Sequence, residues 1–133
     1  MSRRETGSSL RRFDLFNYVE YDPGSMDPIL GEFEQLVLIA VLRLGDDAYG
    51  ATIRREIEER TGRRLAISAV YTTLDRLETK GCVRSWIGEP TATRGGRRRK
   101  HFALQPLGAR ALKTAYSAFT GMVAGLEQRL KRL

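Results

Sequence analysis

The sequence predicts a mainly α-helical protein with a small two-stranded antiparallel wing, that is, a winged helix-turn-helix domain followed by a long C-terminal dimerisation helix. Two observations support this fold class. Residues 68–101 read as a helix, a tight stop, a strand, a basic loop and a returning strand. Residues 106–133 carry an apolar repeat of about 3.5 residues, the period of a coiled-coil seam.

The 133 residues are enough for one domain with a modest core. We expect a flexible N-terminal tail at 1–27, a winged helix-turn-helix domain at 28–105 and a dimerisation helix at 106–133. Residues 1–25 show no sustained period, and chain ends fray unless they are tied down. Alternatives stay open for Leu15, Phe16, Tyr18 and Val19, which could form one docking turn, and for Met26, which could be the natural start.

The first predicted helix is strongly apolar. Every position from Leu36 to Leu42 is apolar, which is typical of a helix buried on most of its sides. The run Gly45-Asp46-Asp47 should end this helix. It therefore belongs to the centre of the core.

A second helix is predicted from about Tyr49 to Thr61, with Ile53 and Ile57 on its inner face. Gly62 should end it. Gly50 lies near its start, where glycine weakens a helix, so we expect either a close packing contact or a special backbone geometry there. The short connection that follows predicts a helix-turn-helix with the next segment.

The third predicted helix is the candidate reading helix. Val70, Leu74 and Leu77 fall at i, i+4 and i+7, one apolar stripe that must face the core. Ser68 can cap its N-terminus and Gly81 can end it. We expect the small, hydroxyl-bearing or basic residues to point the other way, where they suit base edges and phosphates: Ser68, Ala69, Thr72, Thr73 and Arg76.

Two strands should form a wing behind this helix. Val83, Ser85 and Ile87 alternate with Arg84 and Trp86. Phe102 and Leu104 alternate on the far side of a loop that contains Gly95-Gly96. Five basic residues lie in and beside this loop, where they would be costly in a core and favourable against phosphates: Arg94, Arg97, Arg98, Arg99 and Lys100.

The net charge of +7 is concentrated in one part of the chain. Residues 80–113 carry nine basic side chains and one acidic one, whereas residues 26–79 carry seven basic and ten acidic. Such a patch favours a polyanionic partner, and double-stranded DNA is the obvious one. A membrane surface fits poorly because the basic segment lacks the apolar helical face that enters lipid.

An enzyme, a metal site and a cofactor are not expected. With one cysteine, Cys82, and one histidine, His101, the usual zinc sites cannot be built, and no catalytic constellation or phosphate-binding glycine loop is present. A single cysteine fits a reducing compartment. No apolar run reaches the length of a membrane span, and the N-terminus lacks a signal-peptide core, so we expect a cytoplasmic protein.

Pro106 suits the first position of the last helix, which we expect to run to residue 133. Such a helix would be about 42 Å long, more than one small domain can cover, so its seam predicts a homodimer. The alternative is a seam that packs only on the first helix. The seam residues repeat at spacings of four and three: Leu112, Tyr116, Phe119, Val123, Leu126, Leu130 and Leu133.

Three segments between about residues 30 and 112 resemble the PadR-like winged-helix transcriptional regulators: LGEFEQLVLIAVLRLGDDAYGATIRREI, AVYTTLDRLETKGCVRSW and GGRRRKHFALQPLG. The resemblance implies a dimeric repressor that places the reading helix in the major groove with the wing beside it. It also implies that Tyr71 approaches the DNA backbone. Because some relatives hold aromatic ligands between subunits, a small-molecule effector of unknown identity is a further candidate partner.

The predicted function is therefore sequence-specific DNA binding by a transcriptional regulator, a repressor that binds an inverted-repeat operator as a dimer. The alternative is a winged-helix interaction module whose basic wing binds an acidic protein. Binding to RNA is disfavoured because no aromatic stacking motif accompanies the basic residues.

Overall fold

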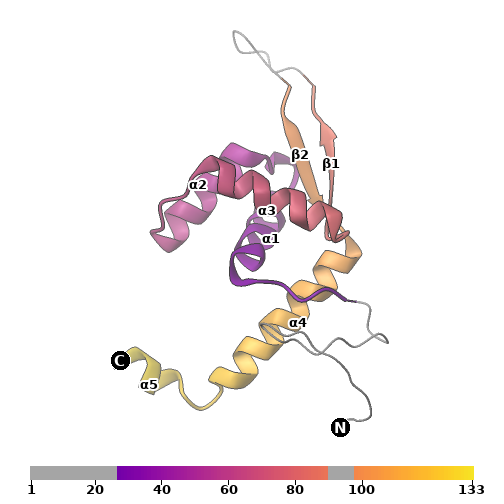
Figure 1. Cartoon of the computed structure of the whole chain (residues 1–133). Helices are drawn as coiled ribbons and strands as arrows, with labels where there is room; N and C mark the ends of the chain where they lie inside the picture. Colours follow the sequence, from indigo (N-terminus) through magenta and orange to yellow (C-terminus); the bar gives the residue numbers. More distant parts are fainter. Residues whose placement is uncertain (1–26, 90–97) are drawn as a thin grey trace.

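The computed structural model describes residues 27–89 and 98–133. The described part is mainly helical with one two-stranded sheet, which confirms the predicted fold class (Figure 1). Its elements follow in the order α1 (Glu32–Leu44), a 3-10 turn η1 (Gly45–Asp47), α2 (Gly50–Thr61), α3 (Ile67–Thr79), β1 (Val83–Ile87), β2 (Lys100–Leu104), α4 (Pro106–Val123) and α5 (Glu127–Lys131). Arg94, Arg97 and the Gly95-Gly96 pair lie outside the described residues, as does the segment before Asp27.

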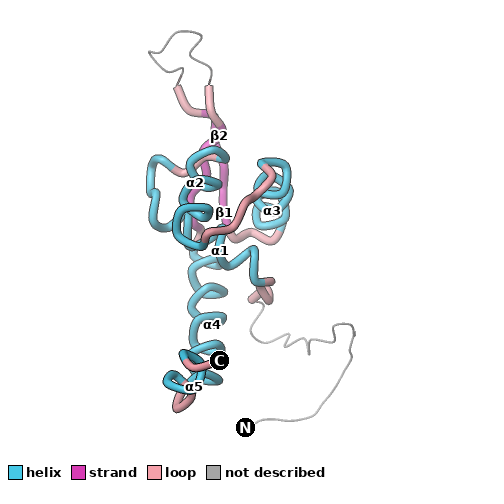
Figure 2. Tube along the Cα trace, turned by 90° about the vertical axis from the view of Figure 1, so that its left-hand side faces the viewer, coloured by secondary structure: helices cyan, strands magenta, loops and turns pink. Residues whose placement is uncertain are grey.

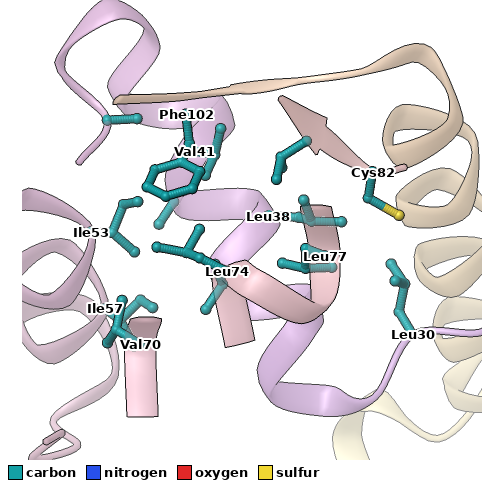
Figure 3. Packing of buried hydrophobic residues seen from close by; sticks show 14 of the residues in the cluster. Leu30, Leu38, Val41, Ile53, Ile57, Val70, Leu74, Leu77, Cys82 and Phe102 are labelled. Atoms are coloured by element: carbon teal, nitrogen blue, oxygen red, sulfur yellow. The ribbon is translucent and has the colours of Figure 1, made fainter. Parts of the chain in front are cut away.

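The core lies where α1, α2, α3 and the sheet meet. Figure 3 shows side chains from these elements converging on one cluster. Leu38, Ile53 and Leu74 are fully buried there, one from each of the three helices. Phe102 closes the cluster from the sheet at 1% exposure. At about 1.5–3 kcal/mol for each buried large apolar side chain, this cluster is the main source of the domain's stability.

The prediction that α1 is buried on most of its sides is confirmed except along one strip of the helix. Val37, Leu38 and Val41 are buried, but Ile39 is 39% and Leu42 61% exposed. Because α2, α3, β2 and α4 all pack on α1, the uncovered apolar residues of the helix are confined to the strip that holds Ile39 and Leu42.

The helix α3 begins earlier than predicted. Ala66 is its N-cap and Ile67 its first residue, so Ser68 lies inside the helix and the prediction that it caps the N-terminus is wrong. The predicted stop is confirmed: Gly81 has φ of +81°, and the Cys82 amide donates to the Leu77 carbonyl at 2.8 Å. This bond closes the last turn in the manner of a Schellman motif and turns the chain into β1.

The predicted hairpin is confirmed. β1 and β2 pair antiparallel, with Val83 opposite Leu104 and Trp86 opposite His101. The hairpin is tied to the helical layer because the Phe102 amide donates to the Ala48 carbonyl at 2.9 Å. Ala48 directly follows η1, so the sheet is fixed to the turn between α1 and α2.

Two ion pairs hold the segment before α1. Lys80, at the end of α3, lies 2.8 Å from the Glu34 carboxylate, which is almost buried and also accepts from the Gly31 amide. Arg110 of α4 lies 3.0 Å from Asp27. Removing one partner of the Glu34 pair would leave a poorly solvated charge, so this contact fixes where the chain enters α1.

The C-terminal segment is not one helix, and the prediction of a continuous helix to residue 133 is wrong. Pro106 does begin α4, but α4 ends at Val123. Gly125 follows with φ of +86°, and a short α5 then changes direction (Figure 2). The apolar period ignores the helix-weakening effect of Gly121 and Gly125, and glycine just past a helix end favours termination.

α4 contacts the start of the sheet directly, because Gly108 of the helix lies against the backbone of Cys82. A Cβ atom at Gly108 would overlap the carbonyl oxygen of Cys82 and lie 3.0 Å from its Cα. The Gln105 amide donates to the same carbonyl at 2.9 Å.

Burial of the Cys82 side chain raises the pKa of its thiol. Among the described helices, none is both long and apolar enough to cross a membrane.

Candidate nucleic-acid interface

The outer face of α3 is exposed along its length. Five of the predicted reading residues lie on this face, on the side away from the core: Ser68, Ala69, Tyr71, Thr72 and Arg76. Asp75, which the sequence argument did not select, lies among them. Small and polar side chains on an uncovered helix are suited to entering the major groove, because the helix can approach the base edges closely.

Thr73 does not belong to this face, and the prediction that it points away from the core is wrong. Its side chain is buried, with 4% exposure. Val70, Thr73, Leu74 and Leu77 occupy i, i+3, i+4 and i+7, which is the full width of a core-facing helical stripe. A threonine can occupy the edge of such a stripe, so polarity alone does not decide on which face of α3 Thr73 lies.

Tyr71 packs on the first turn of α2. A Cβ atom at Gly50 would overlap Cζ and Oη of Tyr71 and lie 2.8 Å from its Cε1. This confirms the expected close contact at Gly50 and explains why no larger residue fits there. The Tyr71 ring is held beside the N-terminus of α2, where backbone amides and the helix dipole favour an anion.

The side chain of Thr52 organises that N-terminus. Its hydroxyl donates to the Asp47 carbonyl at 2.6 Å and accepts from the Tyr49 amide at 3.0 Å. Thr52 is buried, so the two hydrogen bonds satisfy its polar group and fix the turn from η1 into α2.

The base of the wing adds positive charge beside the same turn. Arg98, Arg99 and Lys100 are exposed. The Arg99 guanidinium lies 4.6 Å from the centre of the Tyr49 ring. Lys100 lies 3.8 Å from Glu78, so its charge is partly compensated within the protein. Arg99 is therefore the predicted wing residue whose contacts bring it next to the α2 N-terminus.

An aromatic cluster at the wing base was not predicted. The His101 ring stacks on Trp86 at 5.5 Å and meets Tyr49 edge to face at 5.4 Å between centroids. Its Nδ1 lies 3.0 Å from the Asp46 carbonyl oxygen. The cross-strand positions of Trp86 and His101 could have indicated the stack once the register was known, but nothing local in the sequence pointed to η1 as the partner.

The predicted dimer residues divide into two groups. On α4, Leu112 packs against the core while Tyr116 and Phe119 are about two-thirds exposed. The later leucines lie beyond the helix break, on or beside α5. Two apolar grooves flank α4: one of about 360 Å³ against α1, which includes Ile39 and Leu42, and one of about 500 Å³ against residues 28–35. The uncovered apolar surface therefore combines α1 and α4.

The model of the PadR-like transcriptional regulators matches residues 37–114, more than half of the chain. The chain belongs to this family. The match spans most of α1, the whole of α2 and α3, the wing strands and the first half of α4, which are the elements that form the surface described above. The members of the PadR-like family are transcriptional regulators, and this chain has their winged-helix fold.

Solved structures agree. A PadR family transcription regulator from hypervirulent Clostridium difficile is similar with a TM-score of 0.60 and 24% identity, over 74% of this chain and 98% of that chain. A PadR family regulator from Eggerthella lenta is similar with a TM-score of 0.57 and 20% identity, over 74% of this chain and 86% of that chain. The complex structure of hsRosR-S1 contains a chain that is 26% identical, with a TM-score of 0.56 over 77% and 84%. Among curated proteins, none matches the sequence significantly.

Proposed function

We propose that this PadR-like regulator binds double-stranded DNA sequence-specifically, as a dimer on an inverted-repeat operator, and acts as a repressor. The observation that carries the proposal is a line of contacts that joins the two predicted DNA-binding elements. Arg99 of the wing lies on Tyr49, Tyr49 caps α2, and Tyr71 of α3 packs on the adjoining Gly50. The wing base and the reading helix thus meet at one helix N-terminus.

This meeting point suits a DNA phosphate. Backbone amides at a helix N-terminus, a tyrosine and an arginine are all groups that contact phosphate oxygens. A phosphate held there would set the depth and register of α3 in the major groove. Such contacts position the protein, and the exposed side chains of α3 then select the sequence.

The apolar surface of α1 and α4 supports the dimer. Tyr116, Phe119 and Met122 are exposed on α4 without a cover within the described chain, and contiguous apolar patches of this kind mark interfaces. A two-fold dimer would present two copies of α3 to one side of the duplex. Half-sites about 34 Å apart, one helical turn, would then accommodate both. A small-molecule effector stays a prediction from the family resemblance.

An electrophoretic shift with the protein's own upstream region tests the proposal. Arg98→Gln should weaken binding to all duplexes and reduce the salt slope by about one unit for a lost phosphate contact. Arg132→Gln is the matched control, because it removes the same charge beyond α5, at the end of the molecule opposite the wing (Figure 1).

Two outcomes would contradict the proposal. If the purified protein binds its upstream region no better than unrelated duplex at physiological salt, sequence-specific recognition is excluded for that site. If Arg98→Gln and Arg132→Gln lower the salt slope equally, the wing has no privileged place in the interface.

A further inference from the structure

One acidic residue, Asp75, occupies the middle of the surface that we propose faces DNA. Ser68, Thr72, Asp75 and Thr79 follow each other at spacings of four, three and four, so they form a single row along α3. All four are exposed. The row runs along the side of the helix opposite Val70 and Leu77.

The Asp75 carboxylate has no hydrogen-bond or ion-pair partner among the described residues. Its neighbours three and four residues away are Tyr71, Thr72, Glu78 and Thr79, so no basic side chain is placed for a helical ion pair. Glu78 of the same helix differs, because it accepts from the Ser85 hydroxyl at 2.7 Å and lies near Lys100.

A carboxylate facing DNA is unfavourable unless it meets a hydrogen-bond donor, since phosphates repel it at every sequence. In the major groove, the donors that base edges offer are the exocyclic amino groups of cytosine and adenine. Aspartate pairs with the cytosine N4 amino group, whereas adenine, which presents a donor beside an acceptor, suits asparagine. Among the base edges in the major groove, cytosine is therefore the one that best offsets the unfavourable charge of an unpaired aspartate on this face.

We infer that Asp75 is a specificity-determining residue that selects cytosine at one position of each half-site. The inference rests on the proposed function, because it requires α3 to lie in the major groove. Asp75 lowers affinity for every duplex through repulsion of the phosphates, and it recovers affinity where the cytosine N4 amino group donates a hydrogen bond to its carboxylate. It therefore contributes discrimination rather than affinity.

Selection from a random duplex library, followed by sequencing of the bound fraction, tests the inference for the full-length protein. The wild type should select cytosine at one position per half-site by about tenfold over the other bases. Asp75→Asn, which keeps the size of the side chain, should shift that position towards adenine and leave the other positions unchanged. Asp75→Ala should relax the position to no preference.

Glu59→Gln is the matched control. Glu59 is an exposed acid on α2, and its substitution changes the net charge by the same amount. Asp75→Asn and Glu59→Gln should both strengthen binding to unrelated duplex at low salt, because each removes one negative charge. Only Asp75→Asn should lose its preference for cytosine, whereas Glu59→Gln should keep the wild-type base preferences. Since Asp75 has no hydrogen bond or ion pair to lose within the described chain, Asp75→Asn should unfold close to the wild-type temperature.

The outcomes separate the two proposals. If the wild type selects a sequence and Asp75→Asn keeps every preference, the assignment of Asp75 is overturned while the proposed function stands. A position that changes in Asp75→Asn but holds a base other than cytosine in the wild type overturns it too. If the wild type selects no sequence at all, the proposed function itself fails.

Discussion

Gly50 packs against the Tyr71 ring, and this contact is possible only because Gly50 has no side chain. Gly50→Ala would normally stabilise the start of a helix, since it reduces the freedom of the unfolded chain. Here the added methyl overlaps the Tyr71 ring. We expect the free energy of unfolding to fall by about 1–3 kcal/mol, the usual effect of overpacking, as measured by urea denaturation.

A double-mutant cycle distinguishes steric overlap from a backbone effect. In the Tyr71→Ala background, the methyl group at Gly50→Ala no longer meets the ring atoms nearest to it, so the destabilisation should largely disappear. If the two substitutions are additive, the ring does not cause the cost, and the close contact between α2 and α3 is not what requires glycine at this position.

Residue-level prediction succeeded where a residue's role follows from helical spacing or backbone geometry. Val70, Leu74 and Leu77 are buried as their spacing predicts, and Gly50, Gly62 and Gly81 occupy positions that their type indicates. It failed for Thr73, because polarity was given more weight than its place in the stripe. Asp75 was not predicted on this face because the residue types expected there attract phosphate, whereas a carboxylate repels it.

At the scale of elements, the wing is held by His101. His101→Ala removes the stack on Trp86, the edge contact with Tyr49 and the bond to the Asp46 carbonyl. We expect the free energy of unfolding to drop by about 1–2 kcal/mol. Trp86 is the sole tryptophan, so its fluorescence should shift to longer wavelength as water reaches the ring.

His101→Phe serves as the control. Phenylalanine can stack on Trp86 but cannot bond to the Asp46 carbonyl, so the emission should return towards the wild-type wavelength while part of the stability stays lost. An unchanged spectrum in His101→Ala would mean that the stack does not shield Trp86.

The elements themselves could be predicted because each carries a local signal: an apolar period, a terminating glycine, or alternation. The break between α4 and α5 shows where such signals mislead. The repeat from Leu112 to Leu133 keeps its spacing through residues 124–126, yet the backbone leaves the helix after Val123 and passes through a positive φ at Gly125. Periodicity reports which side chains are apolar, whereas helix continuity also depends on the conformational freedom of the backbone.

At the scale of the whole molecule, assembly should depend on α4. Phe119→Asp places a charge on the exposed apolar face of α4, in the groove against residues 28–35. Burying an unpaired carboxylate in a subunit interface is strongly unfavourable, so the variant should sediment as a monomer and lose most of its affinity for a full operator. Sedimentation velocity at several protein concentrations measures the shift.

Ile87→Asp is the control for assembly, since Ile87 is also an exposed apolar residue but lies on the wing. It should leave the sedimentation coefficient unchanged. The pair Leu126→Ala and Leu130→Ala tests whether α5 adds to the interface. A dimer that survives Phe119→Asp would place the subunit contact elsewhere than on α4.

The contact between Gly108 and the Cys82 carbonyl makes this region a splice point for protein engineering. At Gly108 no side chain lies between α4 and the Cys82 backbone, so this contact sets how closely α4 approaches the start of β1. A chimera could keep residues 27–111 and exchange everything beyond for another helical segment. The chimera would keep the native orientation of the DNA-facing surface relative to the start of the grafted helix. The length and crossing angle of the grafted helix would then determine the operator spacing.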